Sequence, residues 1–474
     1  MQYETVIGLE VHCELSTQSK IFCGCSTKFG GAPNTHVCPG CAGFPGTLPV
    51  LNEAVVERAV RAGLALNCDI ARRSTFDRKH YFYPDLPGAY QVTQLYAPVC
   101  TNGWVELDSG KRVRIKQIHM EEDAGKLVHD DFEDATLADY NRGSMPLLEI
   151  VSQPDMRSAE EAIEYLEKLK AILEYTGVSD CKMQEGSIRA DINISVRPMG
   201  EEALGVRAEM KNLNSMRSIA RAVAYEAARH VEVIEAGGRL RQETRRWDDD
   251  RGESYAMRGK ENAQDYKYFP NPDLPPVVLS EEYIAGIRDT MPELPEAKKR
   301  RYISALGLPA YDTGIITGSI HLVRLFERAY AVCGDAKEAA NWVMGEVLGQ
   351  LKSTQTLPED MSFDPDALGK LILLVRGNVI NRGTAKKVFA EVFAHNVDPE
   401  AYVKEHNLAL VTDAAAIREK IAQVIAENQK SVKEYKEGKE KALQFLIGQS
   451  MKALRGRAPA GEVARVLGEL LAEN

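Results

Sequence analysis

The sequence predicts an α+β amino-terminal domain followed by two helical regions. Short alternating strands and Gly/Pro turns dominate from residue 1 to about 292, and one long helical pattern lies among them. Two proline-punctuated segments, PNPDLPP and MPELPEAKKR, then precede a change to helical periodicity. We therefore predict three domains, which comprise residues 1–292, 293–405 and 406–474.

Size and composition are those of an ordinary soluble protein. The chain has 474 residues, of which 44% are hydrophobic and 27% are charged, so it can form two or three separate cores. It contains neither an apolar run of membrane-spanning length nor a signal-peptide pattern, and we expect a cytoplasmic protein with no membrane partner. The net charge of −10 argues against nonspecific binding to nucleic acid but leaves room for a local basic patch.

The first predicted strand, residues 6–15, alternates strictly in polarity. Its apolar face consists of Ile7, Leu9, Val11, Cys13 and Leu15, and its other face consists of Gly8, Glu10, His12 and Glu14. This alternation is typical of a strand that has one face on the core and one face in water. The same pattern would also place Glu10 and His12 side by side in a functional site, and the strand alone leaves both explanations open.

The long helical pattern has recognisable start and stop signals. Ser158 can cap its amino terminus, and Glu161, three residues later, completes a capping box. An amphipathic run continues to Thr176 and ends before Gly177. A helix of this length among strands gives the first domain its mixed α+β character.

Four of the nine cysteines have the spacing of a zinc site. In FCGCSTKFGGAPNTHVCPGC, a C-x-C pair, a twelve-residue loop and a C-x-x-C pair supply Cys23, Cys25, Cys38 and Cys41. Two thiolates on each of two tight turns complete a tetrahedral site without an open position, so a structural zinc ion is expected. His36, inside the loop, is a weaker ligand candidate. A redox C-x-x-C would not need the second pair.

Several other predicted strands carry charged residues on one face. In SIRADINISV and VRAEMK, polar and apolar residues alternate, and HMEEDAG holds three consecutive acids. MPLLEIV places Glu149 in an otherwise apolar strand, where an unpaired carboxylate would be costly. The candidate residues on these strands are Glu121, Glu122, Asp123, Glu149, Arg189, Asp191, Asn193, Glu209 and Lys211.

Strands of this kind, placed side by side, would bring many carboxylates together. Carboxylates repel one another unless cations lie between them, which favours a divalent metal site. Oxygen ligands favour Mg²⁺, the neighbouring basic residues suit phosphate, and His12 would suit Mn²⁺ or a position behind the ligands. A network of structural salt bridges is the alternative explanation for each residue taken singly.

A basic patch lies near the carboxy terminus. Residues 429–457 contain eight basic residues and three acids, a local excess of +5 in an acidic chain. Such a patch is typical of a nucleic-acid-binding surface. A solvated helix face with i to i+4 charge pairs, such as Lys430 with Glu434, explains it equally well.

An ordered series of motifs resembles one protein family along almost the whole chain. The motifs are GLEVHCEL, the CxC and CPGC pairs, PGTLPVLN, FDRKHYFYPDLP, HMEEDAGK, DYNRGSMPLLEIVSQPD, QEGSIRADINIS, EMKNLNSM, QETRRWD, DYKYFPNPDLPP and FLIGQSMKALRGRAP. Together they are similar to the GatB family, which is the B subunit of the bacterial glutamyl-tRNA(Gln)/aspartyl-tRNA(Asn) amidotransferase. The resemblance implies a cradle-like catalytic domain related to the glutamine synthetase fold, an all-α helical domain and a small α-helical YqeY-like tail.

The same resemblance implies an activity and residues that carry it. The activity is ATP-dependent transamidation of misacylated Glu-tRNA(Gln), Asp-tRNA(Asn) or both, through a phosphorylated side-chain carboxylate. The residues expected around the metal ions are Glu10, His12, Glu121, Glu149 and Asp191, the last of them at a second ion, with Glu209 as a further metal ligand. Lys79 is expected to contact phosphate and Arg189 the substrate. The zinc cluster would shape the cradle, and the tail would bind tRNA through Lys433, Lys436, Lys452 and Arg455.

The source of ammonia is expected to lie outside this chain. The sequence has no Gly/Ser-rich amidase signature, and the resemblance implies two partners in a heterotrimer, a glutaminase and a small third protein, which are its A and C components. The family usually has a lysine where this chain has Gly88, so one expected cation is absent. Two rival functions are a free-standing ligase that amidates glutamate and a noncatalytic, zinc-stabilised tRNA adaptor, and dependence on tRNA and on ATP distinguishes them.

Overall fold

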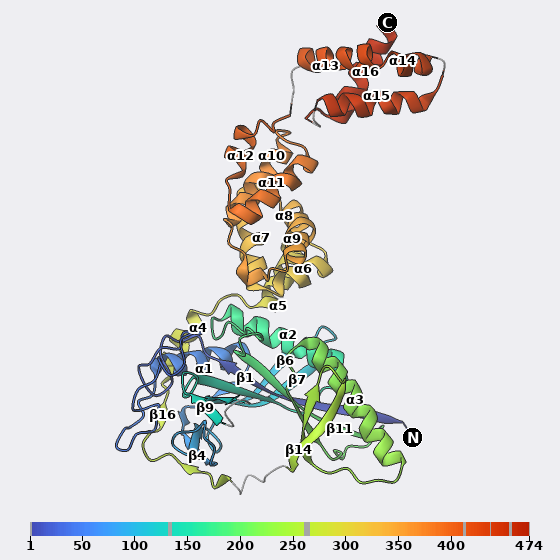
Figure 1. The fold of residues 1–474 in the computed structure, drawn as a ribbon. Coiled ribbons are helices and arrows are strands. Elements are labelled where there is room, and N and C mark those ends of the chain that lie inside the picture. Colours follow the sequence, from blue (N-terminus) through green and yellow to red (C-terminus); the bar gives the residue numbers. More distant parts are fainter. Residues whose placement is uncertain are drawn as a thin grey trace. The chain divides into compact units, whose positions relative to one another are not determined.

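The computed structural model describes residues 2–130, 135–259, 266–410, 414–436, 438–454 and 457–473. These residues divide into two compact units, Met1–Pro295 and Glu296–Asn474 (Figure 1). The first is the mixed α/β unit and the second is helical, which confirms that part of the predicted fold class. The boundaries predicted at 292 and 405 remain predictions. No helix in the described part of the chain is long and apolar enough to span a membrane.

A nine-stranded sheet forms the centre of the first unit. Neighbouring strands are antiparallel except for the parallel pair β12 and β13. In spatial order the strands are β14 (Glu253–Gly259), β13 (Glu243–Asp248), β12 (Ala208–Lys211), β11 (Ile188–Pro198), β1 (Tyr3–Glu14), β10 (Pro146–Ser152), β7 (Arg112–Glu122), β6 (Cys100–Glu106) and β2 (Asp69–Ile70).

Three helices cover the apolar face of this sheet (Figure 1). They are α1 (Glu53–Ala65), α2 (Ala159–Tyr175) and α3 (Met216–Glu235), and their buried side chains join one core with those of β1, β7, β10 and β11. On β1, Val11 and Cys13 are buried whereas Glu10, His12 and Glu14 are partly exposed, as the alternation predicted. The face opposite the helices is therefore polar.

Helix α2 has the ends that the sequence predicted. The Ser158 hydroxyl accepts a hydrogen bond from the Glu161 amide, and the Glu161 carboxylate accepts one from the Arg157 amide. Gly177 follows the helix with a φ of 66°, a left-handed conformation that favours glycine. Local sequence signals thus determine where α2 begins and ends.

Smaller elements surround the main sheet. They are β15 (Phe269–Pro270), β4 (Asp77–His80) and β5 (Tyr90–Thr93) in one sheet, β16 (Val277–Val278) with β3 (Arg73–Ser74), and β8 (Lys126–Asp130) with β9 (Ala135–Asp139). Helix α4 (Glu281–Asp289) packs on α1. Between β1 and α1 lies the loop that carries the four clustered cysteines.

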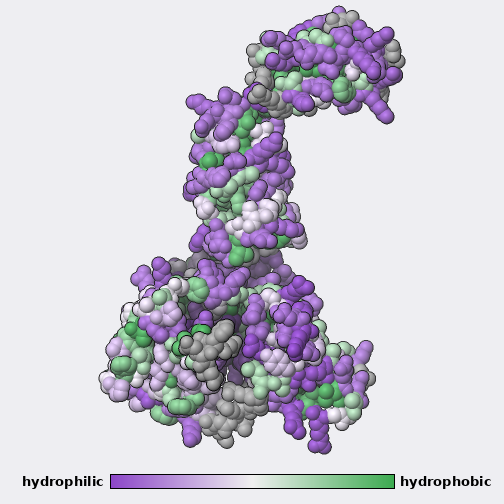
Figure 2. Space-filling model, viewed as in Figure 1, coloured by the Kyte–Doolittle hydropathy of each residue, from purple (hydrophilic) through white to green (hydrophobic). Residues whose placement is uncertain are grey.

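The second unit consists of helices. They are α5 (Pro295–Leu306), α6 (Ala310–Thr317), α7 (Ile320–Cys333), α8 (Ala336–Trp342), the π-helical turn Val343–Val347, α9 (Leu348–Thr354), the 3₁₀ turn Pro358–Asp360, α10 (Pro365–Arg376), α11 (Arg382–His395), α12 (Pro399–Glu405), α13 (Ala414–Glu427), α14 (Gln429–Lys436), α15 (Glu440–Ala453) and α16 (Ala460–Glu473). Helices α13 to α16 share a core that includes Ile421, Leu446 and Leu467. Hydrophilic side chains dominate their visible surface in Figure 2.

Candidate active site and cysteine cluster

Strand register brings the predicted polar residues together on the face of the sheet opposite the three helices. One row of paired residues crosses four strands in the order Arg189, His12, Glu149 and His119. A neighbouring row pairs Asp191 with Glu10 and then Glu10 with Val151. The first row therefore places an imidazole on each side of Glu149, whereas Glu10 has an apolar neighbour on β10.

Three side chains converge on this face as a candidate metal site. The His12 Nε2 atom lies 3.6 Å from Glu121 Oε1 and 3.6 Å from Glu149 Oε2. One ligand atom from each of the three residues falls within 4.8 Å of the others. Glu121 is almost fully buried, and Thr93 Oγ1 donates a hydrogen bond to its second oxygen at 3.2 Å. Strands β1, β7 and β10 thus supply one donor each.

The donor set fits a divalent cation. Two carboxylates and one imidazole can bind Mg²⁺ or Mn²⁺, and the imidazole favours Mn²⁺ over Mg²⁺. Octahedral ligands of such ions lie about 3 Å apart when adjacent and about 4 Å apart when opposite. The two 3.6 Å separations lie between these values.

His119 completes the cluster, and it was not among the site residues predicted from the sequence. Its Nε2 atom lies 2.8 Å from Glu149 Oε2 and 3.6 Å from Glu121 Oε2, and the Gln117 amide contacts its Nδ1 atom at 3.5 Å. The alternation of Gln117, His119 and Glu121 in QIHMEE could have identified it, because all three residues face the same way.

Charges in the cluster shift the pKa values of both histidines upward. Burial alone would lower the pKa of His12, but the hydrogen bond and charge of Glu149, with the charge of Glu121, raise it to about 9. Burial opposes protonation of His119 as well, and the two carboxylates raise its pKa to about 10. Burial would raise the pKa of Glu149, but the two imidazoles hold it well below its usual range. His12 must lose its proton to bind a metal.

The other predicted metal ligands have protein partners. Asn193 Nδ2 donates to Glu10 Oε1 at 2.9 Å. The Lys211 ammonium lies 2.5 Å from Asp191 Oδ2 and 3.1 Å from Glu209 Oε1, so one cation already bridges these two carboxylates. The structure therefore places Glu10, Asp191 and Glu209 beside the three-residue cluster, and their role as ligands remains a prediction.

Two arginines meet on one carboxylate at the edge of the cluster. Arg189 Nη2 lies 3.0 Å from Asp123 Oδ2, and Arg142 Nε lies 2.6 Å from the same oxygen. Arg142 also lies 3.3 Å from Glu14 Oε1. Burial raises the pKa of Glu14 to about 6, although Arg142 opposes this shift. The predicted substrate residue Arg189 is thus one of two guanidinium groups next to the cluster.

Lys79 lies among aromatic rings of the small sheet. Its ammonium is 5.0 Å from the centre of the Tyr266 ring and 5.6 Å from that of Tyr81, which is cation–π geometry. Burial raises the pKa of both Tyr81 and Tyr268, and the charges of Glu121 and Glu149 add to the shift of Tyr268. The charge of Glu121 also contributes to the raised pKa of Tyr81, so one of the two rings beside Lys79 lies within electrostatic range of the cluster.

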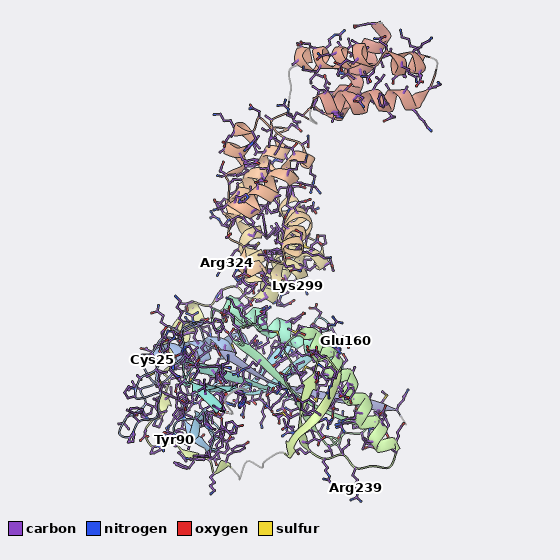
Figure 3. The ribbon with its side chains drawn as sticks, viewed as in Figure 1. Cys25, Tyr90, Glu160, Arg239, Lys299 and Arg324 are labelled. Atoms are coloured by element: carbon purple, nitrogen blue, oxygen red, sulfur yellow. The ribbon has the colours of Figure 1, made fainter. Side chains whose placement is uncertain are left out.

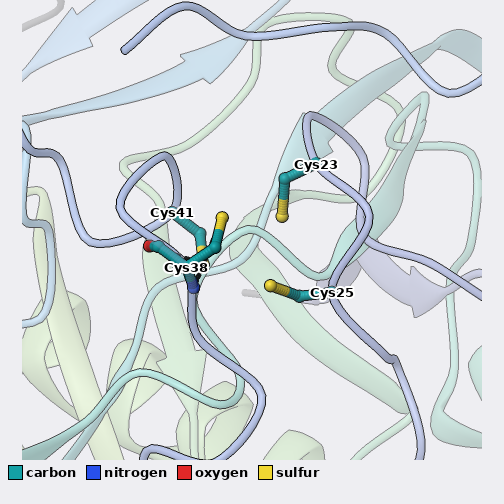
Figure 4. Close-up of side chains that lie close together, drawn as sticks. All are labelled: Cys23, Cys25, Cys38 and Cys41. Atoms are coloured by element: carbon teal, nitrogen blue, oxygen red, sulfur yellow. Dashed lines mark hydrogen bonds between the residues drawn. The ribbon is translucent and has the colours of Figure 1, made fainter. Parts of the chain in front are cut away.

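The four predicted zinc ligands converge in the loop between β1 and α1 (Figure 4). Their sulfur atoms all lie within 4.8 Å of one another, and the Sγ atoms of Cys38 and Cys41 are 3.9 Å apart. Zinc–sulfur bonds of about 2.3 Å put tetrahedral sulfur ligands about 3.8 Å apart, so the geometry fits zinc. A hydrogen bond from Cys23 lowers the pKa of Cys41 to about 4, and the nearby Lys20 contributes to this shift. His36 does not belong to this group of described ligands.

A cavity of about 280 Å³ lies beside the cysteine cluster. Its lining includes Cys41, Asp85, Gly88, Tyr90 and Glu122. Figure 3 labels Cys25 of the cysteine cluster and Tyr90 of the cavity lining, which lie on the same side of the first unit. Burial raises the pKa of Glu122 to about 7, and Gly88 leaves the wall without the lysine that the resemblance led us to expect.

The predicted tRNA-binding lysines lie on two tail helices. Lys433 and Lys436 are exposed on α14, and Lys452 is exposed on α15. Arg455 lies outside the described residues. Among the described residues of the tail, the ion pair of Glu434 is with Lys439, whose Nζ atom lies 3.8 Å from Glu434 Oε1. The expected partner was Lys430. The three described lysines are available to a polyanion.

Comparison with known proteins covers nearly the whole chain. Residues 5–285 match the GatB/GatE catalytic domain, and residues 324–471 match the GatB domain. A relative from Lachnoclostridium phytofermentans is 56% identical over 474 residues, and one from Caldicellulosiruptor bescii is 54% identical over 477 residues, each with 99% of both chains covered. A relative from Thermoanaerobacter sp. (strain X514) is 53% identical over 476 residues, with 100% of both chains covered. All three are named as the B subunit of an aspartyl/glutamyl-tRNA(Asn/Gln) amidotransferase.

Proposed function

Because this chain belongs to the GatB family of aspartyl/glutamyl-tRNA(Asn/Gln) amidotransferase subunits, we propose that its polar sheet face activates the side-chain carboxylate of a misacylated tRNA. The chain is a subunit of a tRNA amidotransferase, a carbon–nitrogen ligase complex that uses ATP. Its reaction amidates Glu-tRNA(Gln), Asp-tRNA(Asn) or both, and yields Gln-tRNA(Gln) and Asn-tRNA(Asn).

The chemistry of amidation explains why such a site needs positive charge. A carboxylate is a poor acyl donor, so one carboxylate oxygen attacks the γ-phosphorus of ATP and ADP leaves. Ammonia then attacks the carbonyl carbon, loses a proton, and displaces inorganic phosphate to leave the amide. The first step brings a triphosphate next to another anion, and cations must offset their repulsion.

One observation carries the proposal: His12, Glu121 and Glu149 converge on the face of the sheet that the helices do not cover. A divalent cation held there, Mg²⁺ or Mn²⁺, would supply Lewis-acid stabilisation for phosphate oxygens. The flanking guanidinium group of Arg189 would orient the substrate, and the ammonium of Lys79 would contact phosphate. Further proposed ligands are Glu10 at the same cation, and Asp191 and Glu209 at a second one.

The remaining assignments concern structure and assembly. The four cysteines are proposed to hold a structural Zn²⁺ ion that keeps their loop folded. The cradle is proposed to share the fold of glutamine synthetase. Ammonia would come from a separate glutaminase, with a small third protein holding the heterotrimer together, and the exposed lysines of the tail would contact tRNA in the cytoplasm.

A substitution at the centre of the cluster tests the proposed site. Glu149→Gln keeps the shape of the side chain but removes the charge that both imidazoles contact, so we expect loss of tRNA-dependent ATP hydrolysis and of amidation. Glu232→Gln on α3 is the matched control, because Glu232 is exposed and lies on the helix-covered side of the sheet. Wild-type turnover of Glu149→Gln at ordinary magnesium concentration would remove this residue from the metal site.

The two rival functions make different predictions in the same assay. A free-standing ligase would form glutamine from glutamate without tRNA, and a noncatalytic adaptor would bind tRNA without consuming ATP. Phosphate release that requires both tRNA and ATP would reject both.

A further inference from the structure

Lys20 is a fully buried lysine next to the cysteine cluster, and the proposed reaction gives it no role. Its side chain is 0% exposed, which is rare for lysine. The Nζ atom lies 3.7 Å from Cys41 Sγ and donates a hydrogen bond to the carbonyl oxygen of Tyr140 at 3.0 Å. A buried ammonium group needs an anionic or strongly polar partner, and the Cys41 sulfur and the Tyr140 carbonyl fill that need.

The charge of the proposed zinc site makes this contact significant. Four thiolates and one Zn²⁺ ion carry a net charge of about −2, which burial makes costly. Cys41 is the most buried of the four residues, at 7% exposure. The Cys38 amide also lies 3.2 Å from Cys41 Sγ, and this amide and the ammonium therefore both donate toward that sulfur.

The second contact of Lys20 fixes the position of its ammonium group. Tyr140 donates its hydroxyl hydrogen bond to the Pro84 carbonyl at 2.7 Å, and its amide donates to Asn34 Oδ1 at 2.8 Å. Asn34 belongs to the loop between the two cysteine pairs, and its own side-chain amide donates to the Ala138 carbonyl at 3.0 Å. The Tyr140 carbonyl is thus held by the same segment that packs against the cysteine loop.

We propose that Lys20 is a positioning residue of the zinc site, whose ammonium offsets part of the thiolate charge and holds Cys41 in its ligating orientation. This inference rests on the proposed zinc occupancy of the cluster. It explains why a lysine is buried at this point, and it adds a supporting contact to a site for which the sequence predicted metal ligands alone.

The test compares zinc retention in two lysine variants of the full chain. Lys20→Met keeps most of the side-chain volume and removes the charge, and Lys28→Met is the control, because Lys28 is an exposed lysine of the same loop. Zinc content is measured after purification, and zinc release to a chromogenic chelator is followed with time. We expect at least a roughly tenfold faster release from Lys20→Met and an unchanged rate for Lys28→Met.

Two outcomes would overturn the proposal in distinguishable ways. Zinc release from Lys20→Met at the wild-type rate would show that the ammonium does not support the zinc site. Absence of zinc from the wild-type chain, with no uptake on zinc addition, would remove the zinc assignment itself and leave the proposed amidation reaction untouched.

A second comparison applies if Lys20→Met folds poorly. The same substitution is made in a chain whose four clustered cysteines are replaced by serine. If Lys20 serves the thiolate cluster, Lys20→Met lowers the melting temperature or prevents folding only when the cysteines are present. An equal loss in both backgrounds would mean that Lys20 acts through Tyr140 alone, and would overturn the proposal.

Discussion

The sheet-face cluster and the cysteine loop both gather side chains that could bind a metal ion, but they do so by different means. His12, Glu121 and Glu149 come from three strands, and the register of those strands brings them together. Cys23, Cys25, Cys38 and Cys41 come from two tight turns separated by a short loop. One site is built into a rigid sheet, whereas the other lies in a loop between a strand and a helix.

This difference indicates what each site requires from a metal ion. The carboxylates of the sheet keep their positions through strand pairing and contacts with His119, so we expect that a metal bound there would serve the reaction rather than the fold. Around the C-x-x-C pair, backbone hydrogen bonds such as that from Ala42 to Cys38 close short turns, and a metal would join these turns to the C-x-C pair. We therefore expect substitutions in the loop to lower stability and substitutions on the sheet face to lower turnover.

The largest expected effect on stability is at the cysteine loop. Cys41→Ser removes a zinc ligand, and we expect a loss of more than about 3 kcal/mol in the free energy of unfolding. Initial turnover of the folded fraction should stay within about twofold of the wild-type value, because no clustered cysteine belongs to the candidate active site. Urea unfolding and initial-rate assays measure the two quantities. Cys68→Ser is the control, and equal stability of both variants would contradict the structural role of zinc.

Glu226 is a buried carboxylate paired with arginine, and it belongs to neither candidate metal site. Its substitution should therefore change stability without changing turnover. Burial would raise the pKa of Glu226, but its contacts with His230 and Arg229 lower it to about 2, and Ser254 donates a further hydrogen bond. Since the folded pKa lies below the unfolded value, the ionised carboxylate stabilises the fold above about pH 4.5, and this contribution disappears as the pH falls toward 2.

We therefore expect Glu226→Gln to lower the free energy of unfolding by about 3 kcal/mol at pH 7. The difference from the wild-type chain should shrink as the pH falls from about 4.5 toward 2, and turnover of the folded variant should not change. Denaturant unfolding across this pH range measures the effect. A difference that is constant with pH would show that the charge of Glu226 is not responsible.

The next effect concerns His119, whose Nε2 atom lies 2.8 Å from Glu149 Oε2 and 3.6 Å from Glu121 Oε2, and which we propose positions these two carboxylates. His119→Leu removes the donor to Glu149, and we expect turnover to fall about 10- to 100-fold, with a higher magnesium requirement. His119→Gln can still present an N–H group to Glu149 and should recover much of the activity. Turnover measured against magnesium concentration separates the two variants. Equal activity of His119→Leu and the wild-type chain would exclude this positioning role.

The smallest expected effect is at the tail. Replacing Lys433, Lys436 and Lys452 with glutamine removes three charges from an exposed surface, and the salt dependence of log K for tRNA binding should fall by about 2 to 3 units of slope. Lys352→Gln on α9 is a control on another exposed helix. Filter binding at several salt concentrations measures the slope. An unchanged affinity and slope would assign these lysines to ordinary solvated surface.

The sequence could predict the features that depend on neighbouring residues. Strand β1, the caps of α2 and the cysteine cluster follow from alternation, from Ser158 with Glu161, and from ligand spacing. Each of these signals lies within a short stretch of chain, so no knowledge of the tertiary structure is needed to read it.

The convergence on the sheet face could be predicted only in part, because strand order is nonlocal. Strand β10 lies between β1 and β7, which places Glu149 between His12 and His119. Glu10 pairs with Val151 on β10, and on β1 it lies two residues before His12, which is the member of the cluster on that strand. No pattern within a single strand specifies these neighbours, and Arg142 was missed for the same reason.

This chain itself is expected to activate and amidate the carboxylate on tRNA. The most direct measurement supplies the purified chain with ATP, Mg²⁺, ammonium chloride and Glu-tRNA(Gln), and follows formation of Gln-tRNA(Gln). We predict conversion with this chain, or conversion once the glutaminase, the small third protein and glutamine are added, and in both cases its loss in Glu149→Gln. Full conversion by Glu149→Gln would contradict the assignment of the sheet-face cluster as the active site.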